Sequence, residues 1–132
     1  MLSKSEYATI VPVHNMNRAI KFYTKTLGGK LIMRAPGDME DVFASVKIGK
    51  EFFWLGPRDP KLKKLDFAFN TFIVKNIKKE VWVLQRRGAK FQKAEKSMPN
   101  SKVEGPIEFS NFGASAFFND SEGNLLMIWQ NA

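Results

Sequence analysis

The chain has 132 residues, of which 44% are hydrophobic and 13% aromatic, so one folded domain with a substantial core is expected. It contains no cysteine, which excludes disulfides, thiolate metal sites and a cysteine nucleophile. Its formal net charge of +8 favours anionic partners. The N-terminus is polar and no run of about 18 apolar residues is present, which predicts a cytoplasmic protein without membrane spans.

The first half of the chain predicts a strand, a helix and three further strands. Residues 7–13 are apolar and β-branched, which is typical of a strand. Asn15 then caps an amphipathic helix that ends at Gly28-Gly29. Further strands are expected at residues 30–34, 42–48 and 51–55, the last two joined by a turn at Gly49-Lys50.

The second half follows the same order. A strand at 67–74 precedes the N-cap Asn76 and a helix at 77–87, which Gly88 ends. The chain is extended again from Lys90, and the later segments are a polar loop at 99–106 and a closing hairpin of strands 112–119 and 125–129. We therefore predict an α+β fold of one domain over residues 1–132, with pseudo-repeated βαβββ modules at about 6–56 and 66–131.

Two motifs at opposite ends of the chain resemble the vicinal oxygen chelate superfamily, which comprises glyoxalases, bleomycin-resistance proteins and extradiol dioxygenases. The first is Asn-Met-Asn-Arg-Ala-Ile-Lys-Phe-Tyr at 15–23 with Leu27-Gly28. The second, Phe-Asn-Asp-Ser-Glu-Gly-Asn at 118–124, is similar to that family's Asp-Pro-Asp-Gly-Asn turn. The resemblance implies paired modules, a curved mixed sheet with a central concave cavity, and a homodimer.

In the family that the chain resembles, His and Glu side chains from four strands usually hold a metal. Counting from the helix caps and from the hairpin glycines places these four positions on Ala8, Phe69, Phe53 and Met127. None of these side chains is a ligand for a hard or borderline divalent ion, and a shift of one residue does not restore a ligand set. The single histidine, His14, lies at a strand-to-helix turn. We therefore expect no metal and no cofactor, and we reject metal-dependent glyoxalase and dioxygenase activity.

Strand alternation predicts an apolar, aromatic bowl where relatives keep the metal. The residues expected to line it and to bind a ligand are Phe43, Phe53, Phe69, Thr71, Phe117, Met127 and Trp129. These side chains suit a planar or hydrophobic small molecule. The alternative is that they fill the space and leave a solid core.

The net charge of the chain narrows the class of ligand expected. A chain of +8 repels a cationic drug, whereas Lys30, Arg34 or Lys47 could meet a carboxylate or phosphate. The cations of the second half, such as Lys75, fall at helical spacing opposite an apolar stripe. They are interpreted as a solvated helix face, so nucleic acid is not an expected partner.

Three functions remain open from the sequence. The first is a metal-independent protein that binds a hydrophobic or aromatic, anionic small molecule in an apolar cavity. The second is a metal-independent lyase or isomerase, for which Glu104 and Glu108 are the candidate general bases. The third is a structural homodimer whose cavity is filled.

Overall fold

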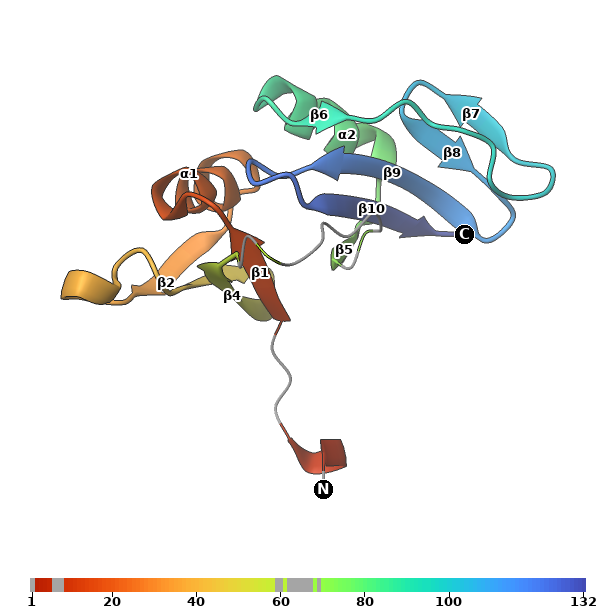
Figure 1. The fold of residues 1–132 in the computed structure, drawn as a ribbon. Helices are drawn as coiled ribbons and strands as arrows, with labels where there is room; N and C mark the ends of the chain where they lie inside the picture. Colours follow the sequence, from red (N-terminus) through yellow and green to blue (C-terminus); the bar gives the residue numbers. More distant parts are fainter. Residues whose placement is uncertain (1, 6–8, 59–60, 62–67, 69) are drawn as a thin grey trace. The chain divides into compact units, whose positions relative to one another are not determined.

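The computed structural model describes residues 2–5, 9–58, 61, 68 and 70–132 (Figure 1). The chain divides into two compact units, unit 1 (Met1–Lys63) and unit 2 (Lys64–Ala132). Each unit has its own β-sheet and its own principal helix, which confirms the predicted α+β class. The single domain over 1–132 and the central cavity stay predictions. The strand expected at 67–74 is described as β5 at Asn70–Ile73; residues 67 and 69 lie outside the described part.

The sheet of unit 1 has four strands in the order β1-β4-β3-β2. Their bounds are β1 (Thr9–Val13), β2 (Lys30–Arg34), β3 (Ala44–Ile48) and β4 (Glu51–Pro57). The first and last strands of this unit, β1 and β4, are parallel neighbours, and the other pairs are antiparallel. Short 3-10 turns occupy Leu2–Lys4 and Gly37–Met39.

The helix of unit 1 changes its winding halfway. Helix α1 (Met16–Lys21) begins at Asn15, whose side-chain oxygen accepts the backbone N–H of Arg18 at 3.0 Å, as the sequence predicts. Residues Phe22–Thr26 then form a π-helical turn, η2, in which the Leu27 N–H donates to the Phe22 carbonyl at 3.1 Å. The predicted segment is helical, but its second half is not the α-helix expected, because apolar spacing alone does not distinguish these two windings.

One face of this sheet packs against α1 and η2. Tyr23 is fully buried and meets Phe53 edge-on, with the ring centroids 5.2 Å apart. Val11, Val46 and Leu55 are also fully buried in the same cluster. Burial of this apolar surface is the main stabilising contribution in unit 1.

Unit 2 has strands in the order β5-β10-β9-β8-β7, with β6 paired to β9. Their bounds are β5 (Asn70–Ile73), β6 (Lys90–Phe91), β7 (Lys102–Glu104), β8 (Ile107–Phe109), β9 (Gly113–Asn119) and β10 (Leu125–Asn131). As in unit 1, the strand before the helix runs parallel to the last strand of the unit. The two units therefore share the same arrangement around their parallel strand pair.

Helix α2 (Ile77–Arg86) lies against β9 and β10 (Figure 1). Its stripe of Ile77, Val81 and Leu84 is buried, which confirms the predicted orientation. The N-terminus of α2 is held twice: Asn76 accepts the Lys79 N–H at 3.1 Å, and the Gln130 side chain in β10 accepts the Ile77 N–H at 2.8 Å. Within the described residues, no helix has the length and hydropathy needed to cross a bilayer.

The cations that the sequence places opposite this stripe are exposed, as predicted: Lys75, Lys79, Arg86 and Lys90.

The segment predicted as a polar loop at 99–106 contains part of a β-hairpin, which corrects that prediction. Strands β7 and β8 pair antiparallel, and the chain turns between them at Gly105-Pro106, where Gly105 has a φ of 56°. Residues Ser101 and Ile107 at the hairpin are buried. The turn residues dominate the local composition, so the three-residue strands on either side escape detection by pattern.

Glu108 in β8 ties the segment before this hairpin to the sheet. Its carboxylate accepts the Ser97 hydroxyl at 2.5 Å, the Ser101 hydroxyl at 2.7 Å, and the backbone N–H groups of Ser97 at 2.6 Å and Met98 at 3.0 Å. Glu108 is buried, and these donors satisfy both of its oxygens.

These hydrogen bonds favour the ionised form of the carboxylate. The Ser97 hydroxyl, followed by the Ser101 hydroxyl, outweighs the opposing effect of burial and lowers the pKa of Glu108 from 4.5 to about 2. Because the folded-state pKa lies below the unfolded value, this contribution to stability is complete above pH 4.5 and is lost as the pH falls towards about 2.

We predict that Glu108→Gln lowers the free energy of unfolding at pH 7 by about 2–3 kcal/mol, because four donors lose a charged acceptor. Urea denaturation measured between pH 7 and pH 2 checks this. The difference between wild type and variant should shrink as the pH falls below 4.5, where the wild-type carboxylate loses its advantage.

The matched control is Glu104→Gln. Glu104 pairs with Lys78 at 3.0 Å, and both side chains are more than half exposed, so the change should cost less than about 1 kcal/mol. Equal losses for the two variants would contradict the role assigned to Glu108.

Candidate functional site

In unit 1, the sheet face turned away from α1 carries exposed apolar and aromatic side chains. We define the unit 1 open face by Ile10, Met33, Phe43, Ser45, Lys47, Phe52 and Trp54. Ile10, Trp54, Ser45 and Met33 lie in one row across the four strands, each directly opposite the next. Ile10 is 57% exposed, Phe52 50% and Trp54 40%, which is unusual for side chains of this size.

Of the residues predicted to line a bowl, Phe43 lies on this open face. It is half-buried and meets Trp54 edge-on, with the ring centroids 5.4 Å apart. An edge-on pair of this kind presents one ring face and one ring edge, an arrangement that accepts a further planar ring.

Phe53 lies on the opposite face, which corrects the prediction. It is 9% exposed and packs on Tyr23 in the helix-side core. The count from Gly49 treated the two hairpins as equivalent, but only the two residues 49–50 separate β3 from β4, whereas residues 120–124 separate β9 from β10. The corresponding residue of unit 1 is therefore Trp54, which pairs with Ile10 as Met127 pairs with Thr71.

Sequence reasoning thus missed Trp54 and Phe52 as open-face residues. The signal was present in the tight turn: a two-residue hairpin at 49–50 pairs Ser45 with Trp54 and Lys47 with Phe52. Phe43 was already expected on this face, Ser45 follows it at a spacing of two, and cross-strand partners share a face.

The unit 2 open face is the sheet surface turned away from α2. We define it by Thr71, Ile73, Glu108, Ser115, Phe117, Met127 and Trp129. Thr71, Met127 and Phe117 form one row, and Ile73, Trp129, Ser115 and Glu108 form the next. The structure therefore brings four of the predicted residues together on one face: Thr71, Phe117, Met127 and Trp129. The fifth predicted residue of this unit, Phe69, lies outside the described residues.

Trp129 has a fixed position on this face. Its indole N–H donates to the Asn131 side chain at 2.8 Å, and its six-membered ring passes over Gly113 in β9. A Cβ at Gly113 would lie 2.6 Å from the Trp129 ring, so only glycine leaves room for it. The Gly113 backbone thus bounds one side of the Trp129 ring.

The residues on these faces do not fit a metal. The two described positions that correspond to ligands of the family are Trp54 and Met127. With their cross-strand neighbours Ile10 and Thr71 they offer one hydroxyl and one thioether but no imidazole or carboxylate. The other two expected positions, Ala8 and Phe69, lie outside the described residues. Among the described residues, no group of three or more His, Cys, Asp or Glu side chains could hold an ion.

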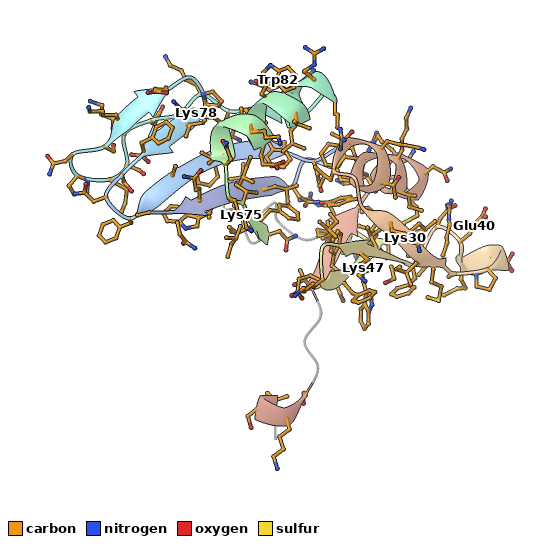
Figure 2. The ribbon with its side chains drawn as sticks, turned by 180° about the vertical axis from the view of Figure 1, so that it is seen from behind. Lys30, Glu40, Lys47, Lys75, Lys78 and Trp82 are labelled. Carbon is orange, nitrogen blue, oxygen red and sulfur yellow. The ribbon has the colours of Figure 1, made fainter. Side chains whose placement is uncertain are left out.

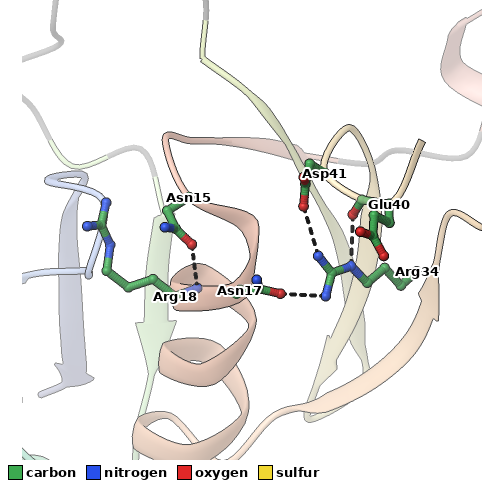
Figure 3. A network of polar contacts seen from close by, with 6 residues as sticks. All are labelled: Asn15, Asn17, Arg18, Arg34, Glu40 and Asp41. Carbon is green, nitrogen blue, oxygen red and sulfur yellow. Dashed lines mark hydrogen bonds and ion pairs between the residues drawn. The ribbon is translucent and has the colours of Figure 1, made fainter. Parts of the chain in front are cut away.

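Arg34, one of the three cations expected near the ligand, is engaged within unit 1 (Figure 3). Its guanidinium donates to the Asn17 side chain at 2.7 Å, the Glu40 carbonyl at 2.8 Å and the Asp41 carboxylate at 3.0 Å. These contacts connect α1, β2 and the 37–42 segment. Arg34 is therefore a structural residue rather than an anion receptor.

Lys30 and Lys47 come from the neighbouring strands β2 and β3 and are directly opposite each other (Figure 2). The Lys47 ammonium lies 5.2 Å from the centroid of the Phe52 ring. Lys47 is half-buried on a central strand, and Lys30 is exposed on the edge strand.

The two candidate general bases are both engaged. Glu108 is held as the carboxylate by four donors, and its low pKa makes it a poor proton acceptor near neutral pH. Glu104 is exposed and pairs with Lys78, whose ammonium also lies 5.3 Å from the Phe109 ring centroid. His14 is exposed between β1 and α1, at the predicted turn.

Comparisons with known structures show the fold. The chain is similar to TnmS3, an antibiotic binding protein from Streptomyces sp. CB03234, with 21% identity, 98% of each chain covered and a TM-score of 0.71. It is similar to a superfamily member from Sphaerobacter thermophilus DSM 20745, with 20% identity, 99% of this chain and 100% of the other covered, and a TM-score of 0.71.

A third similar structure is a glyoxalase/bleomycin resistance protein from Streptomyces sp. CB03234, with 23% identity, 96% of this chain and 100% of the other covered, and a TM-score of 0.65. A comparison with curated proteins finds no match. The family description "Glyoxalase/Bleomycin resistance protein/Dioxygenase superfamily" matches residues 7–128. The chain therefore belongs to the glyoxalase, bleomycin resistance protein and dioxygenase superfamily.

Proposed function

We propose that the protein is a metal-independent binding protein that holds a hydrophobic or aromatic, anionic small molecule in an apolar cavity. The observation that carries this proposal is that the two described open-face positions corresponding to ligand positions of the family hold Trp54 and Met127, with Ile10 opposite Trp54. Side chains of this kind bind planar apolar groups through burial and stacking.

The printed description of one similar structure supports the same class of function. TnmS3 is described as an antibiotic binding protein, and the chain shares its fold over nearly its full length. A fold of this family can therefore serve binding. The nature of the ligand for the present chain follows from its own residues.

Charge supports an anionic ligand. Unit 1 contains eleven Lys and Arg residues and six Asp and Glu residues, a formal charge of +5 out of the chain's +8. A field of this sign attracts anions and repels cations before contact.

The two candidate general bases, Glu104 and Glu108, do not favour the enzyme alternative. Glu108 is held by four hydrogen bonds, and Glu104 is paired at the surface. The homodimer and the cytoplasmic location belong to the proposal too; they rest on the family resemblance and on composition.

We predict that an aromatic carboxylate such as 2-naphthoate raises the melting temperature of the wild-type protein. Trp54→Ala should weaken its binding by about tenfold, because it removes a ring from the unit 1 open face, and Trp129→Ala tests the unit 2 open face in the same way. Differential scanning fluorimetry and isothermal titration calorimetry check this, with each variant compared to its own ligand-free form.

Trp82→Ala is the matched control. Trp82 is 58% exposed on α2, the helix on the opposite side of the sheet from the unit 2 open face, with the Arg86 guanidinium 4.6 Å from its ring centroid. Its loss should leave binding unchanged. A panel of aromatic anions that gives no shift at millimolar concentration, or equal losses in all three variants, would count against the proposal.

We also predict that dialysis against EDTA changes neither the melting temperature nor 2-naphthoate binding. A resident ion present at 100 times its Kd would contribute about 2.7 kcal/mol, and its removal would be easily measured. Elemental analysis of the purified protein is the second readout. Stoichiometric zinc, iron or nickel would overturn metal independence.

A further inference from the structure

We propose that Lys47 is the specificity-determining residue of the unit 1 open face, where its ammonium pairs with the carboxylate of an aromatic ligand lying on Trp54 and Phe43. This inference rests on the proposed function and adds the group that selects an acid over a neutral analogue. It follows from the position, the surroundings and the charge of Lys47.

The position of Lys47 is set by the β3–β4 ladder. Lys47 is directly opposite Phe52, and Ser45, two residues earlier, is directly opposite Trp54. Residues two apart in a strand share a face, so Lys47 flanks the Trp54 ring on the open side of the sheet. A planar ligand resting on that ring would carry a substituent at its edge towards Lys47.

The surroundings of Lys47 decide whether its charge is already neutralised. Its ammonium lies over the Phe52 ring, and no carboxylate of the described residues is within ion-pair distance of it. Glu51 pairs by register with Ile48, which packs on the helix-side core, so Glu51 belongs to the other face. Asp41 is bound to Arg34.

The cross-strand neighbour of Lys47 is also positively charged, which strengthens the positive potential there. Lys30 is directly opposite Lys47, and like charges in that relation disfavour the strand pairing. A bound anion would relieve this repulsion. Lys47 is half-buried beside aromatic side chains, where an ion pair is screened less than at the open surface.

The three cations expected near a ligand are therefore not equivalent. Arg34 is bound by Asn17, Glu40 and Asp41. Lys30 is exposed on the edge strand β2. Of these three, Lys47 alone lies on a central strand, is partly buried and contacts an open-face ring. It is therefore the residue that distinguishes a charged ligand from a neutral one.

The test compares 2-naphthoate with 2-naphthamide, which has the same ring and no charge. Isothermal titration calorimetry should show wild type binding the acid about tenfold more tightly than the amide, as expected for a charge-assisted hydrogen bond. Lys47→Met should lose that preference and keep its affinity for the amide. Lys47→Arg should retain most of the preference.

Lys50→Met is the matched control, because it removes the same charge from the exposed turn three residues away. It should keep the acid preference. Equal affinity of wild type for acid and amide, or equal loss of preference in Lys47→Met and Lys50→Met, would overturn the role of Lys47 alone. Binding of neither compound to wild type would overturn the proposed function and this inference together.

Discussion

The lengths of two hairpin turns determine which side chains each unit keeps for its core and which it presents outward. In unit 1, β3 and β4 are joined by Gly49 and Lys50 only, with Gly49 at a φ of 60°. In unit 2, the Asp120 carboxylate accepts the N–H groups of Glu122 and Asn124, each at 2.8 Å, and thereby fixes a five-residue turn at 120–124. Since side chains alternate along a strand, one residue more or less in either turn would exchange the two faces.

Most of the fold could be predicted from the sequence because its elements carry local signals. The Asn15 and Asn76 caps, the apolar stripe of α2 and the glycines that end the helices each act within a few residues. The count from Gly49 places Phe53 on the wrong face because it equates the two-residue turn at 49–50 with the five-residue turn at 120–124. The π-helical turn at 22–26 and the short β7–β8 hairpin also lack a distinctive period.

The charged residues of the two sheets differ in how many hydrogen bonds they make within the protein. Arg34 and Glu108 each gather several hydrogen bonds and hold segments that pattern alone would describe as loops. Their charge is satisfied inside the protein, so they organise the scaffold on which the open faces sit. The open faces themselves are built mainly from apolar and aromatic side chains, with the hydroxyls of Ser45, Thr71 and Ser115 among them. Sequence composition shows this change of chemistry clearly, whereas only the strand register shows which rings are involved.

The π-helical turn at Phe22–Thr26 has an evolutionary consequence. A turn with an i→i+5 bond accommodates one residue more than an α-helical turn, so loss of a single residue there would leave a continuous regular helix. The loss would instead displace Gly29, because the Gly29 N–H donates to the Tyr23 carbonyl at 2.9 Å. Gly29 has no space for a side chain beside Val46 and Ile48, so its position is constrained. In relatives that differ by a residue in this helix, we therefore expect the backbone to differ at the start of β2, the edge strand of the unit 1 sheet.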